Sequence, residues 1–124
     1  DIDNNVIVQK SFAFAIRCVN LCKYLREEKK EYEMSKQLIR SGTSIGANVK
    51  EALRAQSKAD FKSKLNISLK EASETEYWIE LLWRTQYINE TAAKSILAYC
   101  VELIKLLTSI IIHITKEQLK SKST

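Results

Sequence analysis

The chain has 124 residues, no proline and only two glycines, and its formal net charge at pH 7 is +5. Sheet folds with many turns use Gly and Pro in those turns, so the composition argues against a sandwich, a barrel and a proline-rich disordered chain. Hydrophobic residues make up 45% of the chain and charged residues 28%. These values are typical of one small soluble globular domain.

Apolar residues recur at three- and four-residue spacing in four long segments, which is the pattern of amphipathic helices. We expect the helices over residues 6–29, 32–56, 58–86 and 89–119. Ser57 directly precedes the third segment, Asn89 begins the fourth, and both have the side chains of helix N-caps. Long helices joined by short turns predict an all-α fold, an antiparallel up-and-down four-helix bundle that forms a single domain over residues 1–124.

The first, third and fourth segments carry more apolar residues than one core-facing stripe needs. In the first segment, a stripe that includes Phe12 and Ile16 runs beside a second stripe that includes Phe14 and Cys18. A broad core face gives such a pattern, and so does a subunit interface. We favour the interface, which predicts that the protein partners with itself as a homo-oligomer.

The fourth segment contains a long apolar run over residues 96–114. Glu102 and Lys105 lie inside this run, one helical turn apart. Two charged side chains at that depth are costly in lipid but ordinary on an amphipathic bundle helix. We therefore expect a bundle helix here and no membrane span.

No group of residues has the spacing of a known catalytic site. His113 is the only histidine, and within an isoleucine run we expect it to be a packed or partly exposed core residue. Cys18, Cys22 and Cys100 are an odd set in a chain without a signal-peptide pattern, which predicts free thiols and a cytoplasmic location. The alternative is a zinc site formed by the three cysteines and His113, but their spacing matches no zinc motif. The Glu-x-x-His signature of di-iron bundles is absent, so we expect no enzyme activity, no cofactor and no metal.

Residues 40–51, RSGTSIGANVKE, place polar side chains beside an apolar stripe of the second helix. At about 100° per residue, the side chains of Arg40, Ser44, Asn48 and Glu51 fall within roughly 80° of one another. Polar groups next to a core need hydrogen-bond partners. Carboxylates of the third helix would supply them, with an Arg–carboxylate pair as the strongest contact. The predicted structural polar network consists of Arg40, Ser44, Asn48, Glu51, Glu71 and Glu74. We favour a role in fixing the register of the bundle over the alternative, a binding site.

Both glycines, Gly42 and Gly46, lie in this same segment of the second helix. Each costs about 1 kcal/mol of helix propensity relative to alanine. A helix without a side chain at such a position can approach its neighbour closely, which would offset the cost. We therefore expect a close helix contact at one of the two glycines.

Positive charge is concentrated in the first part of the chain. Residues 10–70 contain 14 basic and 6 acidic residues, whereas residues 71–124 contain 6 basic and 7 acidic residues. The candidate nucleic-acid-binding residues are Lys36, Lys50, Arg54, Lys58 and Lys62. No helix-turn-helix, RRM, KH or zinc-finger pattern accompanies them, so they predict contact with the phosphate backbone of RNA or DNA without sequence readout. An acidic protein partner is the alternative, and a Lys-rich helical surface without a partner gives the same pattern.

The polar segment belongs to two stretches, QLIRSGTSIGANVKEALRAQSKADF (37–61) and KLNISLKEASETEYWIELL (64–82). These stretches resemble the bacterial four helix bundle protein family, also named the 23S rRNA-intervening sequence protein family. The positions that match the family's pattern are Arg40, Ser44, Ile45, Asn48, Glu51, Phe61, Glu71, Glu74 and Trp78. Ala52 departs from the pattern, since many members have Gly there.

The resemblance implies an up-and-down four-helix bundle and, as in several members, a homopentameric ring. Genes of this type lie in insertions within bacterial 23S rRNA genes. Related proteins are basic pentameric accessory subunits of diversity-generating retroelements, which associate with a reverse transcriptase and nucleic acid. The implied partners are therefore RNA, DNA, a reverse transcriptase or another protein. For most members the biochemical role is not established, so the family name does not imply a ribosomal role.

Overall fold

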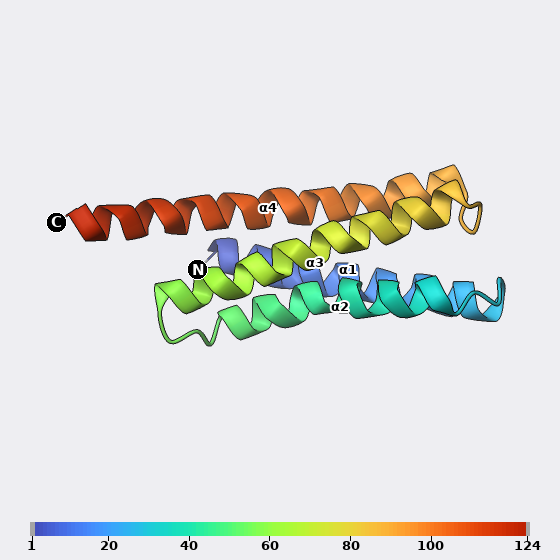
Figure 1. The fold of residues 1–124 in the computed structure, drawn as a ribbon, viewed down its shortest axis with the longest axis horizontal. Helices are drawn as coiled ribbons and strands as arrows, with labels where there is room; N and C mark the ends of the chain where they lie inside the picture. Colours follow the sequence, from blue (N-terminus) through green and yellow to red (C-terminus); the bar gives the residue numbers. More distant parts are fainter. Residues whose placement is uncertain (1, 124) are drawn as a thin grey trace.

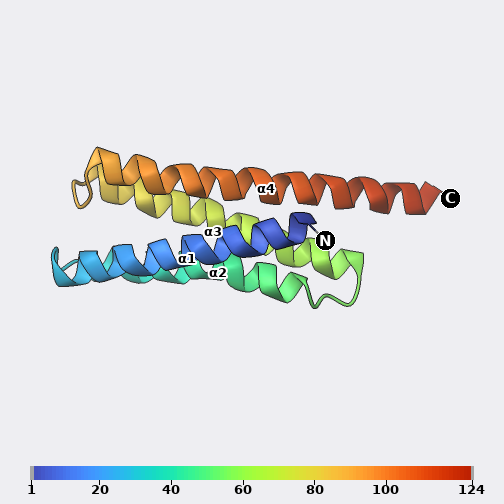
Figure 2. The ribbon, with the colours of Figure 1, turned by 180° about the vertical axis from the view of Figure 1, so that it is seen from behind.

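The structure is a computed structural model that describes residues 2–123. This part of the chain forms four α-helices and no strands. The helices are α1 (Ile2–Glu27), α2 (Glu33–Ala52), α3 (Lys58–Arg84) and α4 (Glu90–Ser123). Consecutive helices run in opposite directions and lie side by side, and α4 returns along α1 (Figures 1 and 2). The predicted all-α four-helix bundle is therefore confirmed.

The turn between α2 and α3 begins earlier than predicted. Helix α2 ends at Ala52, whereas the sequence pattern extended it to residue 56. Ser57 has an extended backbone, with φ −155° and ψ 166°, and its side chain accepts a hydrogen bond from the Asp60 amide at 3.0 Å. This conformation interrupts any helix at Ser57. Helix α2 ends earlier, because the amides of Arg54 and Ala55 donate to the carbonyls three residues before them, those of Glu51 and Ala52, both at 3.0 Å, and not four residues before them as in an α-helix. Asn89 accepts a hydrogen bond from the Ala92 amide at 2.8 Å, and both predicted N-caps are thus confirmed.

The turn between α1 and α2 is held by a buried carboxylate that the sequence pattern did not single out. Glu31 is 8% exposed, and its side chain accepts hydrogen bonds from backbone amides at the start of α2. The donors are the amides of Glu33, Met34 and Ser35, at 3.1, 3.0 and 2.8 Å. A negative charge on the free amides at a helix start stabilises that helix. The chain reverses at Lys30, which adopts the left-handed conformation with φ 55°.

The core runs along the bundle and receives one apolar stripe from each helix. Its largest fully buried side chains include Ile7, Phe14, Leu25, Leu38, Ile45, Leu65, Ile79, Leu82, Leu103 and Leu107. Of the two apolar stripes on α1, the one with Phe14 and Cys18 is fully buried. In the other stripe, Phe12 is 68% exposed and Ile16 is 49% exposed. Phe12 and Ile16 therefore lie on the surface, outside the core.

Gly42 marks a close approach of α1 and α2. A Cβ atom at this position would lie 2.5 Å from Sγ and 3.0 Å from Cβ of Cys18. At Gly46 an added Cβ would lie 3.4 Å from the carbonyl oxygen and the hydroxyl of Ser11, which is tight but not a clash. The expected close helix contact is thus confirmed at Gly42, where the missing side chain offsets the low helix propensity of glycine.

Helix α4 has 34 residues against 20 in α2, and its last turns project beyond the other helices (Figures 1 and 2). By length and composition alone, α4 is the one helix among the described residues that could cross a membrane, between Glu90 and Lys122. The most apolar stretch of this helix is 22% buried. A single helix of this kind is a weak indication of a membrane span. Here it packs along α3 and, less closely, along α1, where Glu102 lies 3.2 Å from Lys10.

Candidate functional site: a polar network and a basic end

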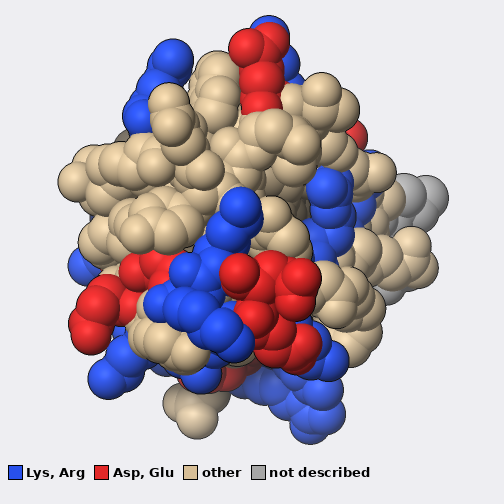
Figure 3. All heavy atoms as spheres, turned by 90° about the vertical axis from the view of Figure 1, so that its right-hand side faces the viewer, with Lys and Arg blue, Asp and Glu red and all other residues tan. Residues whose placement is uncertain are grey.

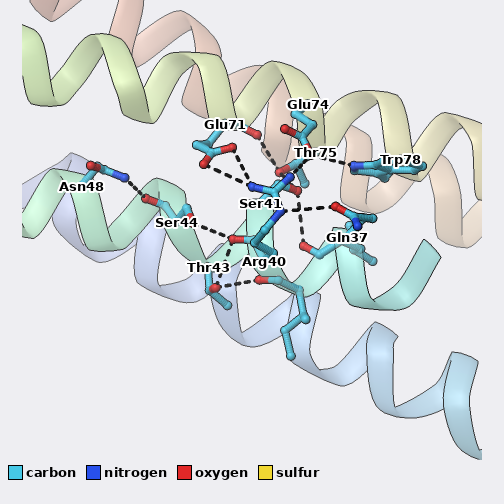
Figure 4. A network of polar contacts seen from close by, with 12 residues as sticks. Gln37, Arg40, Ser41, Thr43, Ser44, Asn48, Glu71, Glu74, Thr75 and Trp78 are labelled. Atoms are coloured by element: carbon cyan, nitrogen blue, oxygen red, sulfur yellow. Dashed lines mark hydrogen bonds and ion pairs between the residues drawn. The ribbon is translucent and has the colours of Figure 1, made fainter. Parts of the chain in front are cut away.

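Arg40 of α2 reaches across to two carboxylates of α3 (Figure 4). Its guanidinium lies 3.4 Å from the Glu71 carboxylate and forms a second ion pair with Glu74. The indole N–H of Trp78 donates to Glu74 at 3.0 Å, and Gln37 accepts from Nε of Arg40 at 3.3 Å. The Glu71 side chain is only 16% exposed, whereas that of Arg40 is 47% exposed, so the carboxylate is shielded from water and the guanidinium is not. The cluster links α2 to α3 at one register.

The structure leaves three members of the predicted polar network outside this cluster. The hydroxyl of Ser44 donates to the carbonyl of Arg40 at 2.6 Å, and the Asn48 amide donates to the carbonyl of Ser44 at 2.8 Å. These bonds stay within α2, because Ser and Asn side chains readily bond to the carbonyl one turn earlier. Glu51 does bridge α2 and α3, but its partner is Lys64, with nitrogen and oxygen 3.5 Å apart.

Two buried hydrogen bonds between α2 and α3 were missed in the sequence. The hydroxyls of Thr75 and Ser41 are 2.8 Å apart, and Ser68 donates to the carbonyl of Ile45 at 2.8 Å. All three hydroxyl side chains are fully buried. The sequence does contain a signal for these hydrogen bonds, because Ser68 and Thr75 lie seven residues apart on the core stripe of α3, where a polar side chain needs a partner. Every buried side-chain nitrogen and oxygen among the described residues has a hydrogen-bond partner.

The three cysteines are free and buried in the core. Burial raises the pKa of the Cys22 thiol to about 11 and that of Cys100 to about 12. Burial also raises the pKa of Cys18, and the nearby thiols of Cys22 and Cys100 add to this shift. The Cys22 thiol donates to the carbonyl of Ser35 at 3.2 Å. These groups are protonated at neutral pH, a state unsuited to nucleophilic attack.

The single histidine lies elsewhere than expected. The side chain of His113 is 74% exposed, with Nε2 3.7 Å from the Glu117 carboxylate, whereas the isoleucine run suggested a core residue. The reason is that the run covers more than one face of α4, and His113 lies on the outer one. Among the described residues, no group of three or more His, Cys, Asp or Glu side chains is placed to hold a metal ion.

The structure brings four of the five basic candidates to one end of the bundle. Lys50 lies in the last turn of α2, Arg54 in the following turn, and Lys58 and Lys62 in the first turns of α3. Lys36 lies near the start of α2, about 21 Å away from Lys50 at 1.5 Å per residue. The two lysines lie on the same side of α2 but near its two ends. The angle of a residue around the helix axis, on which the prediction was based, does not show this separation.

The two ends of the bundle differ in charge. One end is formed by the α2–α3 turn and the end of α4. Here residues 50–70 contain six basic and two acidic residues, and residues 116–122 contain three basic residues and one acidic residue. We call this the basic end. At the opposite end, residues 23–36 contain five basic and four acidic residues. Figure 3 shows acidic and basic side chains next to one another at that opposite end.

A polar groove of about 540 Å³ lies at the basic end, between α3 and the last part of α4. Its lining includes the side chains of Lys62, Asn66, Lys70 and Gln118. Ammonium, amide and hydroxyl groups of this kind are the usual donors to phosphate oxygens.

The helix order and the contacts between neighbouring helices define an up-and-down four-helix bundle whose second and third helices are joined by a polar network. The sequence profile of the 23S rRNA-intervening sequence protein family matches residues 3–109, and the chain belongs to this family.

A crystal structure at 1.70 Å resolution is similar to this chain, with a TM-score of 0.87 and 60% sequence identity. It is that of a protein of unknown function from the S23 ribosomal protein family of Bacteroides thetaiotaomicron VPI-5482. The similarity covers 88% of this chain and 97% of that chain. No protein with curated annotation matches the chain.

Proposed function

We propose that this protein is a non-enzymatic, cytoplasmic helical bundle that binds nucleic acid, RNA in the first place, through phosphate contacts at the basic end. The observation that carries the proposal is the excess of cations there. Four of them have no carboxylate oxygen within 4.0 Å among the described residues. They are Lys50, Arg54, Lys62 and Lys70. Cations without an acidic partner are free to replace the counterions of a polyanion.

The polar groove at the basic end supports phosphate contact without sequence readout. Lys62 and Lys70 lie eight residues apart on α3, a separation of about 12 Å along the helix axis. Asn66 lies between them in the groove lining. The sequence carries no helix-turn-helix, RRM, KH or zinc-finger pattern, so we expect affinity with little sequence preference.

The family membership and the apolar surfaces support an oligomeric form of this function. The resemblance implies a homopentameric ring, and in a ring each subunit would contribute one basic end. Several basic ends on one particle would contact one nucleic acid at several places, which raises the overall affinity above that of one subunit.

The test is a salt titration of RNA binding with two matched triple variants. In R54E/K62E/K70E three cations of the basic end become anions, and in K23E/K29E/K36E the same change is made at the opposite end. We expect the first variant to lose at least about tenfold in affinity and to lower the salt slope by about three, one for each lost phosphate contact. The second should change the affinity far less. Absence of RNA and DNA binding at low salt, or equal losses in both variants, would overturn the proposal.

An accessory subunit that binds an acidic protein partner is the second candidate. One observation favours it: Leu53 is 48% exposed beside Lys50 and Arg54, and an apolar side chain among cations suits a protein surface better than bare phosphate. A pull-down that recovers one stoichiometric protein after nuclease treatment, and loses it in R54E/K62E/K70E, would support this candidate over nucleic acid.

A further inference from the structure

The polar groove at the basic end carries hydrogen-bonding side chains at regular spacing along α3. Lys62, Asn66 and Lys70 line it at four-residue steps, each about 6 Å along the helix axis, and within roughly 80° around that axis. Ser63 lies beside this row, and Gln118 of α4 forms part of the other wall. The groove therefore offers a line of ammonium, amide and hydroxyl groups about 12 Å long.

These polar side chains are not engaged within the molecule. Among the described residues, no hydrogen bond or ion pair is made by the side chains of Lys62, Ser63, Asn66, Lys70 and Gln118. Elsewhere in the bundle such groups bond back to their own helix, as the Asn48 amide does to the carbonyl of Ser44 at 2.8 Å. Glu117, the carboxylate next to Gln118, is already paired with Lys58, with nitrogen and oxygen 3.8 Å apart. The groove is thus positively charged and free to bond a ligand.

The aromatic side chains lie away from this groove. Among the described residues its lining contains none, and Phe61 in the first turn of α3 packs against the core. Phe12 lines the space between α1 and α2, across the bundle from the groove. The other exposed aromatic side chains are Tyr24, Tyr32, Tyr77 and Tyr99. Proteins that bind single strands without sequence preference use aromatic rings on which the bases stack, and this groove offers no such platform.

We propose that the groove binds double-stranded RNA in the A form, with the backbone of one strand lying along α3. Lys62 and Lys70 contact phosphate oxygens, and the amides of Asn66 and Gln118 bond to the 2′-hydroxyl groups of the intervening sugars. Proteins recognise A-form RNA through such hydroxyl and phosphate contacts across its wide, shallow minor groove. This inference rests on the proposed function and names its substrate class.

A duplex is favoured over a single strand because its backbone is already ordered. A flexible strand loses conformational freedom when it is fixed along a groove, and stacking on aromatic rings normally offsets that loss. In a duplex the bases stack on one another, so the lysines meet phosphates that are already held in place.

RNA is favoured over DNA because of the 2′-hydroxyl group. This hydroxyl both donates and accepts hydrogen bonds, as do the side-chain amides of Asn66 and Gln118. A DNA sugar lacks the hydroxyl and leaves both amides without that partner, whereas the lysines contact the phosphates of either duplex.

The first test compares three probes of one sequence by fluorescence anisotropy at the same salt concentration. They are an RNA duplex of about 20 base pairs, one of its strands alone, chosen without self-complementarity, and the corresponding DNA duplex. We expect the RNA duplex to bind at least about tenfold more tightly than the single strand, which finds no stacking platform. It should bind about three- to tenfold more tightly than the DNA duplex, which lacks the hydroxyl contacts.

The second test removes the amides and keeps the lysines. In Asn66→Ala/Gln118→Ala the affinity for the RNA duplex should fall to that for the DNA duplex. The DNA affinity and the salt slope should not change, since the number of phosphate contacts is the same. The matched control is Gln9→Ala/Asn20→Ala, which changes the same residue types at exposed positions of α1 outside the groove and should alter no affinity. Circular dichroism would verify the fold of both variants.

The outcomes separate this inference from the proposed function. Absence of binding to every probe at low salt overturns both. A single strand or a DNA duplex that binds as tightly as the RNA duplex overturns this inference and leaves the proposed function standing. Equal losses for the RNA and DNA duplexes in Asn66→Ala/Gln118→Ala also overturn it, because the amides would then contact phosphate.

Discussion

Helix α2 is held closely on both of its sides, whereas the seam between α1 and α4 is open. Toward α1, Gly42 packs against Cys18, and toward α3, Arg40 pairs with Glu71 while hydroxyls bond in the core. At the α1–α4 seam the polar contacts are exposed. They are Lys10 with Glu102 at 3.2 Å, Arg17 with Ser95 at 3.1 Å, and the Arg17 guanidinium 5.0 Å from the Tyr99 ring centre.

This difference shows where the register of the bundle is set. Close packing and shielded hydrogen bonds are specific to one alignment of the helices, whereas exposed ion pairs adapt to several and contribute little. The side chains that hold α2 in place belong to the same stretches that carry the family pattern. A groove of about 280 Å³ remains at the other seam, between Arg17 of α1 and Ile96 of α4. The predictions below test this contrast, from the largest expected effect to the smallest.

The buried thiols test whether the core of the bundle is closed to solvent. Their pKa values are raised in the folded chain, so below pH 9 the thiols are protonated in both states and the free energy of unfolding is unaffected. Above pH 9 only the unfolded chain ionises, which favours unfolding by up to about 1.4 kcal/mol per pH unit for each thiol. For Cys22 this loss ends near pH 11.

Urea unfolding between pH 8 and pH 10.5 measures this effect. A Cys22→Ala/Cys100→Ala variant should lose less stability over the same range, because it retains only one of the three thiols. Equal pH dependence in both chains would mean that the thiols ionise as readily in the folded chain as in the unfolded chain.

Gly42→Ala should lower the free energy of unfolding by about 2 kcal/mol, because the new Cβ forces α1 and α2 apart at Cys18. Gly46→Ala is the matched control. There the nearest contact is 3.4 Å, and the gain in helix propensity offsets the crowding, so the change should stay below about 1 kcal/mol. Thermal unfolding of both variants measures the contrast, and equal effects would contradict the close approach at Gly42.

Arg40→Ala should cost about 1–2 kcal/mol, since it leaves the shielded Glu71 carboxylate without its partner. Lys64→Ala removes the other α2–α3 ion pair, with Glu51, whose side chain is 61% exposed, and should cost less than about half as much. Urea titrations would separate the two. A smaller loss for Arg40 than for Lys64 would show that the cluster does not hold α2.

Lys10→Ala at the open seam should change stability by less than about 0.5 kcal/mol, because both partners of this ion pair are more than 40% exposed. A double-mutant cycle with Glu102→Ala measures the pair itself. A coupling energy above about 1 kcal/mol would make the α1–α4 seam as specific as the α2–α3 seam and remove the contrast.

Helical periodicity and cap chemistry were sufficient to predict the fold, but not which face of each helix is covered. Ser57 and Asn89 cap the starts of α3 and α4 by hydrogen bonds to amides three residues later, and such bonds depend on nearby residues only. The two apolar stripes of α1 are equally hydrophobic, and tertiary packing alone decided that Phe14 faces the core and Phe12 the solvent. Glu31 was overlooked because a carboxylate in a charged turn has no pattern that distinguishes a cap from a solvated side chain.

The part of the candidate site that could be predicted is the set of ion pairs between α2 and α3. Arg40 and the acids of α3 follow from angle and charge complementarity. Ser44 and Asn48 do not join them, since a bond to their own helix competes with any bond across the interface. The sequence analysis grouped Lys36 with the other cations by its angle around the helix. That angle does not depend on distance along the axis, and in the structure Lys36 lies near the other end of α2.

The cap formed by Glu31 has a consequence for the order of folding. It joins the end of α1 to the start of α2 through contacts between residues close in sequence, so little loop-closure entropy is lost in making them. We expect the α1–α2 hairpin to form before the transition state and to serve as the template on which α3 and then α4 assemble. Glu31→Ala should therefore slow refolding more than it speeds unfolding, which a denaturant chevron measures. The reverse would place this turn among the last parts of the chain to form.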